Sequence, residues 1–140
     1  MDVPAFFPSP ALSPGDLKCV GILELAYIGD SVFDVYVRGQ LTLRGFKAHD
    51  MHLRAVSSVN ARAQAAALET LMPLLTPEEQ AVVRRGRNAH AHHHAPKGVP
   101  YEVYAEATAL EALIGQLYLG GELARLNELL SHILQGELFT

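Results

Sequence analysis

Apolar residues recur every three to four positions along most of the chain, which is the spacing of one face of an α-helix. Polar residues, Pro and Gly divide this pattern into helical segments at 14–44, 49–71, 77–85, 100–118 and 122–134. No segment alternates apolar and polar residues as a half-buried strand does. The pattern therefore predicts an all-α fold in a single domain covering residues 1–140, with an irregular stretch at 1–13.

Capping residues and glycines set the expected boundaries of these helices. Ser13 before Pro14 suits the N-cap and the first position of a helix, and Thr76 with Glu79 has the spacing of a capping box. Glycines mark the expected helix ends, at Gly45, Gly86, Gly120 and Gly121. Two more fall inside the first helix, where glycine costs about 1 kcal/mol relative to alanine and indicates close packing: Gly21 and Gly29.

Two carboxylates lie within the apolar stripes of predicted helices. At about 100° per residue, Asp30 and Glu111 each share a helix face with apolar residues. Those residues are Leu23, Ala26, Val37 and Leu41 for Asp30, and Tyr104, Ala107, Ile114 and Tyr118 for Glu111. A buried carboxylate is costly without a partner, so two of them favour a shared cation. Either side chain could instead lie at the edge of its stripe and reach water.

The composition excludes several classes of protein. A chain of 140 residues that is 49% apolar and 19% charged is typical of a globular protein and not of a disordered one. No apolar run is long enough to span a bilayer, and Met1–Pro4 lacks the basic region of a secretory signal. Cys19 is the only cysteine, which excludes an internal disulfide and a cysteine-based zinc site. A cytoplasmic protein with no membrane partner is expected.

The distribution of charge indicates one local basic surface. The net charge of −4 argues against a protein covered with basic residues. Between Glu79 and Glu102, however, there is no acidic residue, and four of the eleven Lys and Arg residues fall there: Arg84, Arg85, Arg87 and Lys97. His90 and the run 92–94 lie in the same segment, within an expected loop at 87–99. Such a surface on an acidic protein is compatible with a polyanionic partner.

Several runs resemble the ribonuclease III family. Leu25–Val32 (LAYIGDSV) resembles the hallmark helix of ribonuclease III domains, and Leu110–Gly115 (LEALIG) resembles the second acidic motif of that family. The similarity is closer to the minimal bacterial branch, mini-ribonuclease III, through three further runs in compatible order: Tyr36–Arg38, His52–Gln64 and Arg85–Ala89. Several ordered motifs are far more specific than any one of them.

The resemblance implies a ribonuclease III-like helical endonuclease domain that cleaves double-stranded RNA as a homodimer, with a role in maturing large-subunit ribosomal RNA precursors. Asp30 and Glu111 would be the catalytic residues and the ligands of Mg²⁺, with Mn²⁺ as a possible substitute. Two carboxylates suit Mg²⁺, which keeps several waters. The residues expected to contact RNA are Arg84, Arg85, Arg87, Asn88 and Lys97.

Two positions depart from the pattern of the larger ribonuclease III enzymes. Ala26 stands where they carry a metal-associated Glu, and Thr108 stands where they usually carry Asp. Both residues are typical of the minimal branch, so fewer carboxylates are expected at the site. Asp34 could accept a hydrogen bond from a metal-bound water, but an ion pair with Arg38 one turn later is the favoured role. We expect no double-stranded-RNA-binding domain like that of the larger enzymes.

Two other functions remain open at this stage. One is a catalytically silent ribonuclease III-like module that binds RNA or a ribosomal protein. A silent relative would be expected to lose Asp30 or Glu111, and this chain retains both. The other is a metal-handling protein that uses the histidine run, although flexible His tracts bind zinc or nickel weakly.

Overall fold

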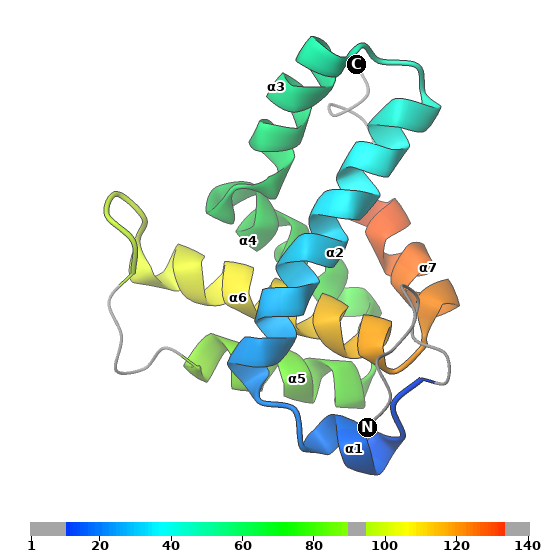
Figure 1. Ribbon diagram of the computed structural model, residues 1–140. Coiled ribbons are helices and arrows are strands. Elements are labelled where there is room, and N and C mark those ends of the chain that lie inside the picture. The colour runs from blue at the N-terminus through cyan, green and yellow to red at the C-terminus, as the bar shows by residue number, and fades with distance from the viewer. Residues whose placement is uncertain (1–10, 90–94, 134–140) are drawn as a thin grey trace.

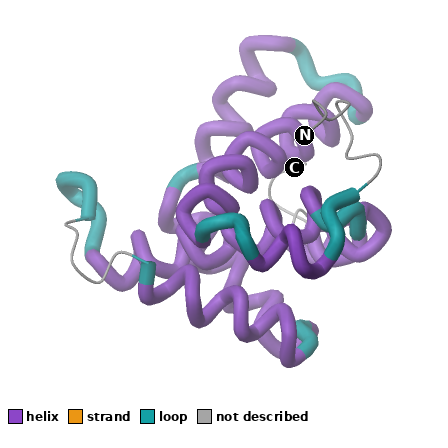
Figure 2. The backbone as a smooth tube through the Cα atoms, turned by 60° about the horizontal axis from the view of Figure 1, so that its bottom comes forward, coloured by secondary structure: helices purple, strands orange, loops and turns teal. Residues whose placement is uncertain are grey.

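The computed structural model describes residues 11–89 and 95–133, and for residues 57–59 it describes the backbone. Within these ranges the chain forms helices and no strand, which confirms the all-α prediction (Figures 1 and 2). The helices are α1 (Pro14–Lys18), α2 (Ile22–Leu43), α3 (Ala48–Val59), α4 (Ala61–Leu71), the short 3₁₀ helix η1 (Met72–Leu74), α5 (Pro77–Asn88), α6 (Tyr101–Leu119) and α7 (Leu123–Ile133). None of those in the described ranges has the length and apolar character needed to cross a membrane.

The helix predicted at 14–44 is two helices, so that prediction was wrong. α1 ends at Lys18, and α2 begins at Ile22 with Gly21 as its N-cap. Gly21 therefore does not lie inside a helix. A Cβ at Gly21 would lie 2.1 Å from Oε2 of Glu24, whose side chain folds back over the start of α2. The sequence pattern hides this break because apolar spacing continues through it.

Two other predicted boundaries were also wrong. The segment 49–71 divides at Asn60, whose side chain accepts a hydrogen bond of 2.9 Å from the Ala63 N–H and caps α4. α5 continues through Gly86 to Asn88. Gly86 packs on the backbone of α6, where an added Cβ would lie 2.6 Å from Cα of Ala109. This glycine permits a close helix contact and does not end a helix, so the loop expected at 87–99 starts two residues later.

Glu79 stabilises two helices at once. The predicted capping box of α5 is confirmed, because the Thr76 N–H donates to Glu79 Oε1 at 2.9 Å and the Glu79 N–H donates to Thr76 Oγ1 at 3.2 Å. Arg125 of α7 donates to both carboxylate oxygens, at 3.0 and 2.8 Å. These bonds, that of Arg125 foremost, hold the pKa of Glu79 below its ordinary value. The network therefore stabilises the fold at pH values above the pKa that Glu79 has in the unfolded chain, and this stabilisation is lost as the pH falls.

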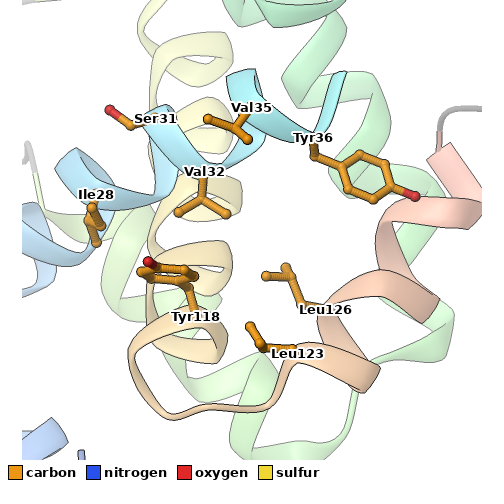
Figure 3. A pocket seen from close by; sticks show the side chains of 8 residues that line it. All are labelled: Ile28, Ser31, Val32, Val35, Tyr36, Tyr118, Leu123 and Leu126. Carbon is orange, nitrogen blue, oxygen red and sulfur yellow. The ribbon is translucent and has the colours of Figure 1, made fainter. Parts of the chain in front are cut away.

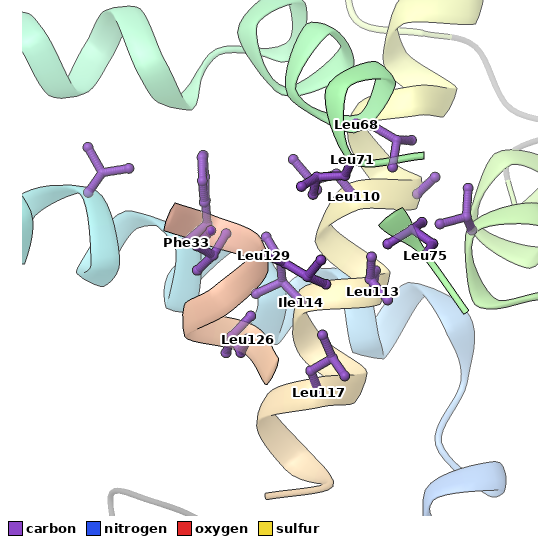
Figure 4. Close-up of a cluster of buried hydrophobic side chains, with 14 of the residues drawn as sticks. Phe33, Leu68, Leu71, Leu75, Leu110, Leu113, Ile114, Leu117, Leu126 and Leu129 are labelled. Carbon is purple, nitrogen blue, oxygen red and sulfur yellow. The ribbon is translucent and has the colours of Figure 1, made fainter. Parts of the chain in front are cut away.

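α6 runs through the middle of the molecule and packs against α2, α4, α5 and α7 (Figure 1). Its buried residues lie on more than one side of the helix, as expected for a helix surrounded by others. The main apolar cluster joins α6 to α2, α4 and α7 (Figure 4), and among its fully buried side chains are Phe33, Leu41, Leu68, Leu110, Leu113 and Leu129.

α2 crosses α6 at a pair of glycines. A Cβ at Gly29 would lie 1.7 Å from the carbonyl oxygen of Glu111, and one at Gly115 would lie 2.0 Å from the carbonyl oxygen of Leu25. The two backbones therefore touch with no side chain between them. The prediction that Gly29 serves close packing is confirmed.

Replacing Gly29 by Ala should destabilise the protein by about 3 kcal/mol, because α2 must move away from α6 to admit the new methyl group. Gly39→Ala is the matched control, since it lies on the same helix and has no atom within 4 Å of the added Cβ. That change should stabilise by up to about 1 kcal/mol through helix propensity. Urea unfolding measures both, and equal effects at the two positions would contradict the close contact.

Candidate active site

The contact between α2 and α6 brings two carboxyl groups together. Asp30 directly follows Gly29 on α2, and Glu111 on α6 supplies the carbonyl that Gly29 touches. The two side chains are close enough to hydrogen-bond, which they can do when one of the carboxyl groups is protonated. Residues far apart in sequence thus meet at one point, as expected for ligands of one cation.

The two carboxyl groups differ in exposure. Glu111 is half-buried, but Asp30 is exposed, so the expectation that both face the core was wrong for Asp30. Gly29 occupies the position of closest contact with α6, which leaves Asp30 beside the contact and open to solvent. Asp30 therefore matches the alternative that the sequence left open, in which a carboxylate lies at the edge of an apolar stripe and reaches water.

Burial raises the pKa of Glu111 to about 8, and the negative charge of Asp30 and the hydrogen bond to it contribute in the same direction. Two adjacent carboxylates repel each other when both are ionised, and a bound cation removes that repulsion. The donor set therefore fits a hard divalent ion such as Mg²⁺. Among the described residues there is no group of three or more His, Cys, Asp or Glu side chains suited to a metal, so most of the ligands would be waters or substrate oxygens.

The predicted RNA-contacting residues fall into two groups. Arg84, Arg85 and Asn88 on the last turns of α5 are exposed, as is Lys97. Arg87 is instead half-buried and forms an ion pair with Glu106 of α6. The histidine run lies outside the described residues. Asp30, and not one of these basic side chains, is the charged group that acts on Glu111.

Comparison with known proteins identifies the family. Residues 23–122 match the Ribonuclease III domain. The Mini-ribonuclease 3 of Symbiobacterium thermophilum is 50% identical over 109 residues, which cover 77% of this chain and 83% of that protein. The chain belongs to the mini-ribonuclease III branch of the ribonuclease III family. As a member of that family it is an endoribonuclease.

Other relatives agree with this assignment. The Mini-ribonuclease 3 of a Synechococcus strain is 44% identical over 77% of each chain. A Mini-ribonuclease 3-like protein of Ilyobacter polytropus is 37% identical over 87% of this chain and 96% of its own. A crystal structure of a protein from Fusobacterium nucleatum has the same fold, with a TM-score of 0.77 and 26% identity over 89% of this chain and 100% of that one.

The positions that depart from the larger ribonuclease III enzymes are filled in ways that add no metal ligand. Ala26 is buried and carries no polar group. Thr108 is buried too, and its hydroxyl donates to the Tyr104 carbonyl at 3.0 Å. Asp34 pairs with Arg38 at 3.0 Å, which confirms the favoured role of that residue. Neither position therefore adds a carboxylate to Asp30 and Glu111 where α2 crosses α6.

Sequence reasoning missed two features of the helices that carry the site. One is Glu106, whose pairing with Arg87 joins α6 to α5 and has no signal in the local sequence. The other is Tyr27, which is 83% exposed although it stands in the hallmark helix. The sequence does contain a signal for this exposure, because Tyr27 lies outside the helical stripe that contains Ala26 and Asp30.

The metal-free protein should lose stability relative to a Glu111→Gln variant as the pH rises. Between about pH 4.5 and 8, Glu111 is protonated in the folded protein and ionised in the unfolded chain. The folded state therefore holds the extra proton, and its stability should fall by up to about 1.4 kcal/mol per pH unit in this window. Denaturant unfolding in EDTA across that range tests this, with the non-titrating Gln variant as the reference. Parallel pH profiles for the two proteins would contradict it.

Proposed function

We propose that the protein is a Mg²⁺-dependent endoribonuclease that cuts double-stranded RNA, with Asp30 and Glu111 as metal ligands and catalytic residues. The observation that carries the proposal is the contact between these two carboxyl groups at the crossing of α2 and α6. The ribonuclease III family provides the class of reaction, and Mn²⁺ is a possible substitute for Mg²⁺.

The side chains of the pair have different tasks. When bound, the cation would neutralise charge at the scissile phosphate and acidify a water molecule. Because burial raises the pKa of Glu111 to about 8, binding of a cation near neutral pH should be accompanied by release of its proton. Asp30 is exposed and is therefore accessible to a large substrate. The Gly29 contact holds the two carboxyl groups at a fixed separation.

The basic residues near the end of α5 support a duplex RNA substrate. Arg84, Arg85, Asn88 and Lys97 are exposed, and cationic or amide side chains of this kind contact phosphates and sugars. A-form RNA is recognised mainly by shape and backbone, which requires no base-specific pocket. We propose precursors of large-subunit ribosomal RNA as the natural substrate, a role that the family resemblance supports.

Asp30→Asn and Glu111→Gln should each abolish cleavage while leaving the fold intact, because each removes charge and little volume. Asp34→Asn is the matched control, since the Asp34 carboxylate lies one turn away and pairs with Arg38. The measurement is cleavage of a labelled RNA duplex with Mg²⁺, with Mn²⁺ and with EDTA. Cleavage by either site variant at the parent rate would contradict the assignment. Binding of the duplex without cleavage by the parent would instead favour the silent module.

An apolar surface on α2 supports a homodimer. A pocket of about 260 Å³ opens between α2, the end of α6 and α7 (Figure 3). It is lined by Ile28, Ser31, Val32, Val35, Tyr36, Tyr118, Leu123 and Leu126. Val35 in this lining is 59% exposed, and Tyr27, also on α2, is 83% exposed. A symmetric pair of such surfaces would bury these residues, and two sites in one dimer could cut both strands of a duplex.

Val35→Asp should convert the dimer to a monomer and lower cleavage, because it places a charge in the apolar surface. Leu43→Asp is the matched control: Leu43 is 82% exposed and lies at the other end of the same helix, away from the pocket. Sedimentation of the parent and both variants provides the measurement. A monomeric parent at working concentrations would contradict the proposed dimer.

A further inference from the structure

Arg87 is held by a two-pronged ion pair that crosses from α5 to α6. Its Nε donates to Oε1 of Glu106 at 2.5 Å and its Nη2 donates to Oε2 at 3.1 Å. The same Nη2 lies 3.8 Å from the sulfur of Met72 in η1. Nε and Nη2 form the edge of the guanidinium group that could otherwise bind a phosphate, and in this ion pair both donate to Glu106 instead. About two thirds of each side chain is covered, at 33% and 31% exposed.

The surroundings of Arg87 are unfavourable for a polyanion. Arg87 lines a pocket between α4 and α6 that also contains Glu69, Glu102 and Glu106. Three carboxylates around one arginine leave this pocket with an excess of negative charge. Glu106 and Glu111 also project about 140° apart around α6, so the ion pair does not face the carboxyl pair of the active site. A phosphate at Arg87 would be repelled, and it would lie on another side of α6 from the site of cleavage.

The ion pair is instead well placed to orient α5. Gly86 touches the backbone of α6 at Ala109, and the next residue of α5 pairs with Glu106, one turn earlier on α6. One contact sets the separation of the two helices and the other sets the rotation and register of the last turn of α5. Arg84 and Arg85 belong to that end of α5, whereas Glu111 belongs to α6.

We propose that Arg87 is a positioning residue, which with Glu106 fixes the exposed arginines of α5 relative to the active site, and that it is not itself a phosphate ligand. The proposal rests on the proposed function, because it assumes that Arg84 and Arg85 contact duplex RNA. It assigns a role to Glu106, a carboxylate that would otherwise be expected only to repel the substrate.

The experiment compares Arg87→Ala, Glu106→Ala and the exchanged pair Arg87→Glu with Glu106→Arg. Each single variant should raise the KM for a duplex about fivefold and leave kcat at saturating duplex unchanged. The exchanged pair should recover most of the loss. Glu69→Ala is the matched control: it removes a carboxylate from the same pocket, and Glu69 forms no ion pair within the described residues, so its KM should stay at the parent value.

The salt dependence of duplex binding separates positioning from direct contact. Arg84→Ala should lower the slope of log affinity against log salt by about 0.9, the loss of one phosphate contact. Arg87→Ala should weaken binding and change the slope only as much as Glu106→Ala does, because both variants release the end of α5, whereas a direct phosphate contact by Arg87 would lower the slope for Arg87→Ala alone. Tighter binding by Glu106→Ala would overturn the proposal, because it would show that Arg87 is a phosphate ligand restrained by Glu106.

Two further outcomes are decisive. Single variants that unfold more easily but keep the parent KM would overturn the proposal, since the pair would then serve stability alone. A parent protein that binds duplex RNA but does not cut it with Mg²⁺ would overturn the proposed function, while the binding measurements would still test Arg87. A parent that does not bind duplex RNA would overturn both.

Discussion

The direct contact between the backbones of α2 and α6 determines most of what this molecule can do. Glycine is required on both sides of it, because a Cβ at Gly29 or Gly115 would fall within 2.0 Å of a carbonyl oxygen on the other helix. Asp30 follows one of these glycines and Glu111 provides one of the carbonyls. The position of the carboxyl pair is therefore a consequence of helix packing, and the pair needs no separate loop to support it.

This placement creates an electrostatic imbalance that only a cation or a proton can relieve. Glu111 is half-buried beside Asp30, and burial raises its pKa to about 8, so near neutral pH this carboxyl group keeps its proton. A cation bound there would have to displace this proton. Ala26 and Thr108 occupy the positions where the larger enzymes carry further carboxylates, so neither position adds a third carboxylate to the pair. A site with few ligands leaves several coordination positions for water and for phosphate oxygens.

The sequence was sufficient to predict the helical class and the capping box at Thr76, because both depend on local spacing. It could not locate the break before Ile22 or the division at Asn60, since the apolar pattern is continuous through both. Gly86 was assigned to a helix end because the local sequence does not show that Ala109 packs against it. The same holds for Arg87, which looks like its exposed neighbours until Glu106, nineteen residues away, is placed beside it.

Glu79 links α5 to α7, two helices that contribute to different surfaces of the molecule. Its carboxylate caps α5 and also holds Arg125 of α7, which further donates to the Leu74 carbonyl at 2.8 Å. If α7 detached, the cap of α5 would lose its cationic partner and Arg125 would lose three acceptors in one step. The bonds from Arg125 to Glu79 of α5 thereby oppose the fraying of α7. Since α7 forms a wall of the apolar pocket and α5 bears the exposed arginines, the pocket and these arginines belong to one cooperative folding unit.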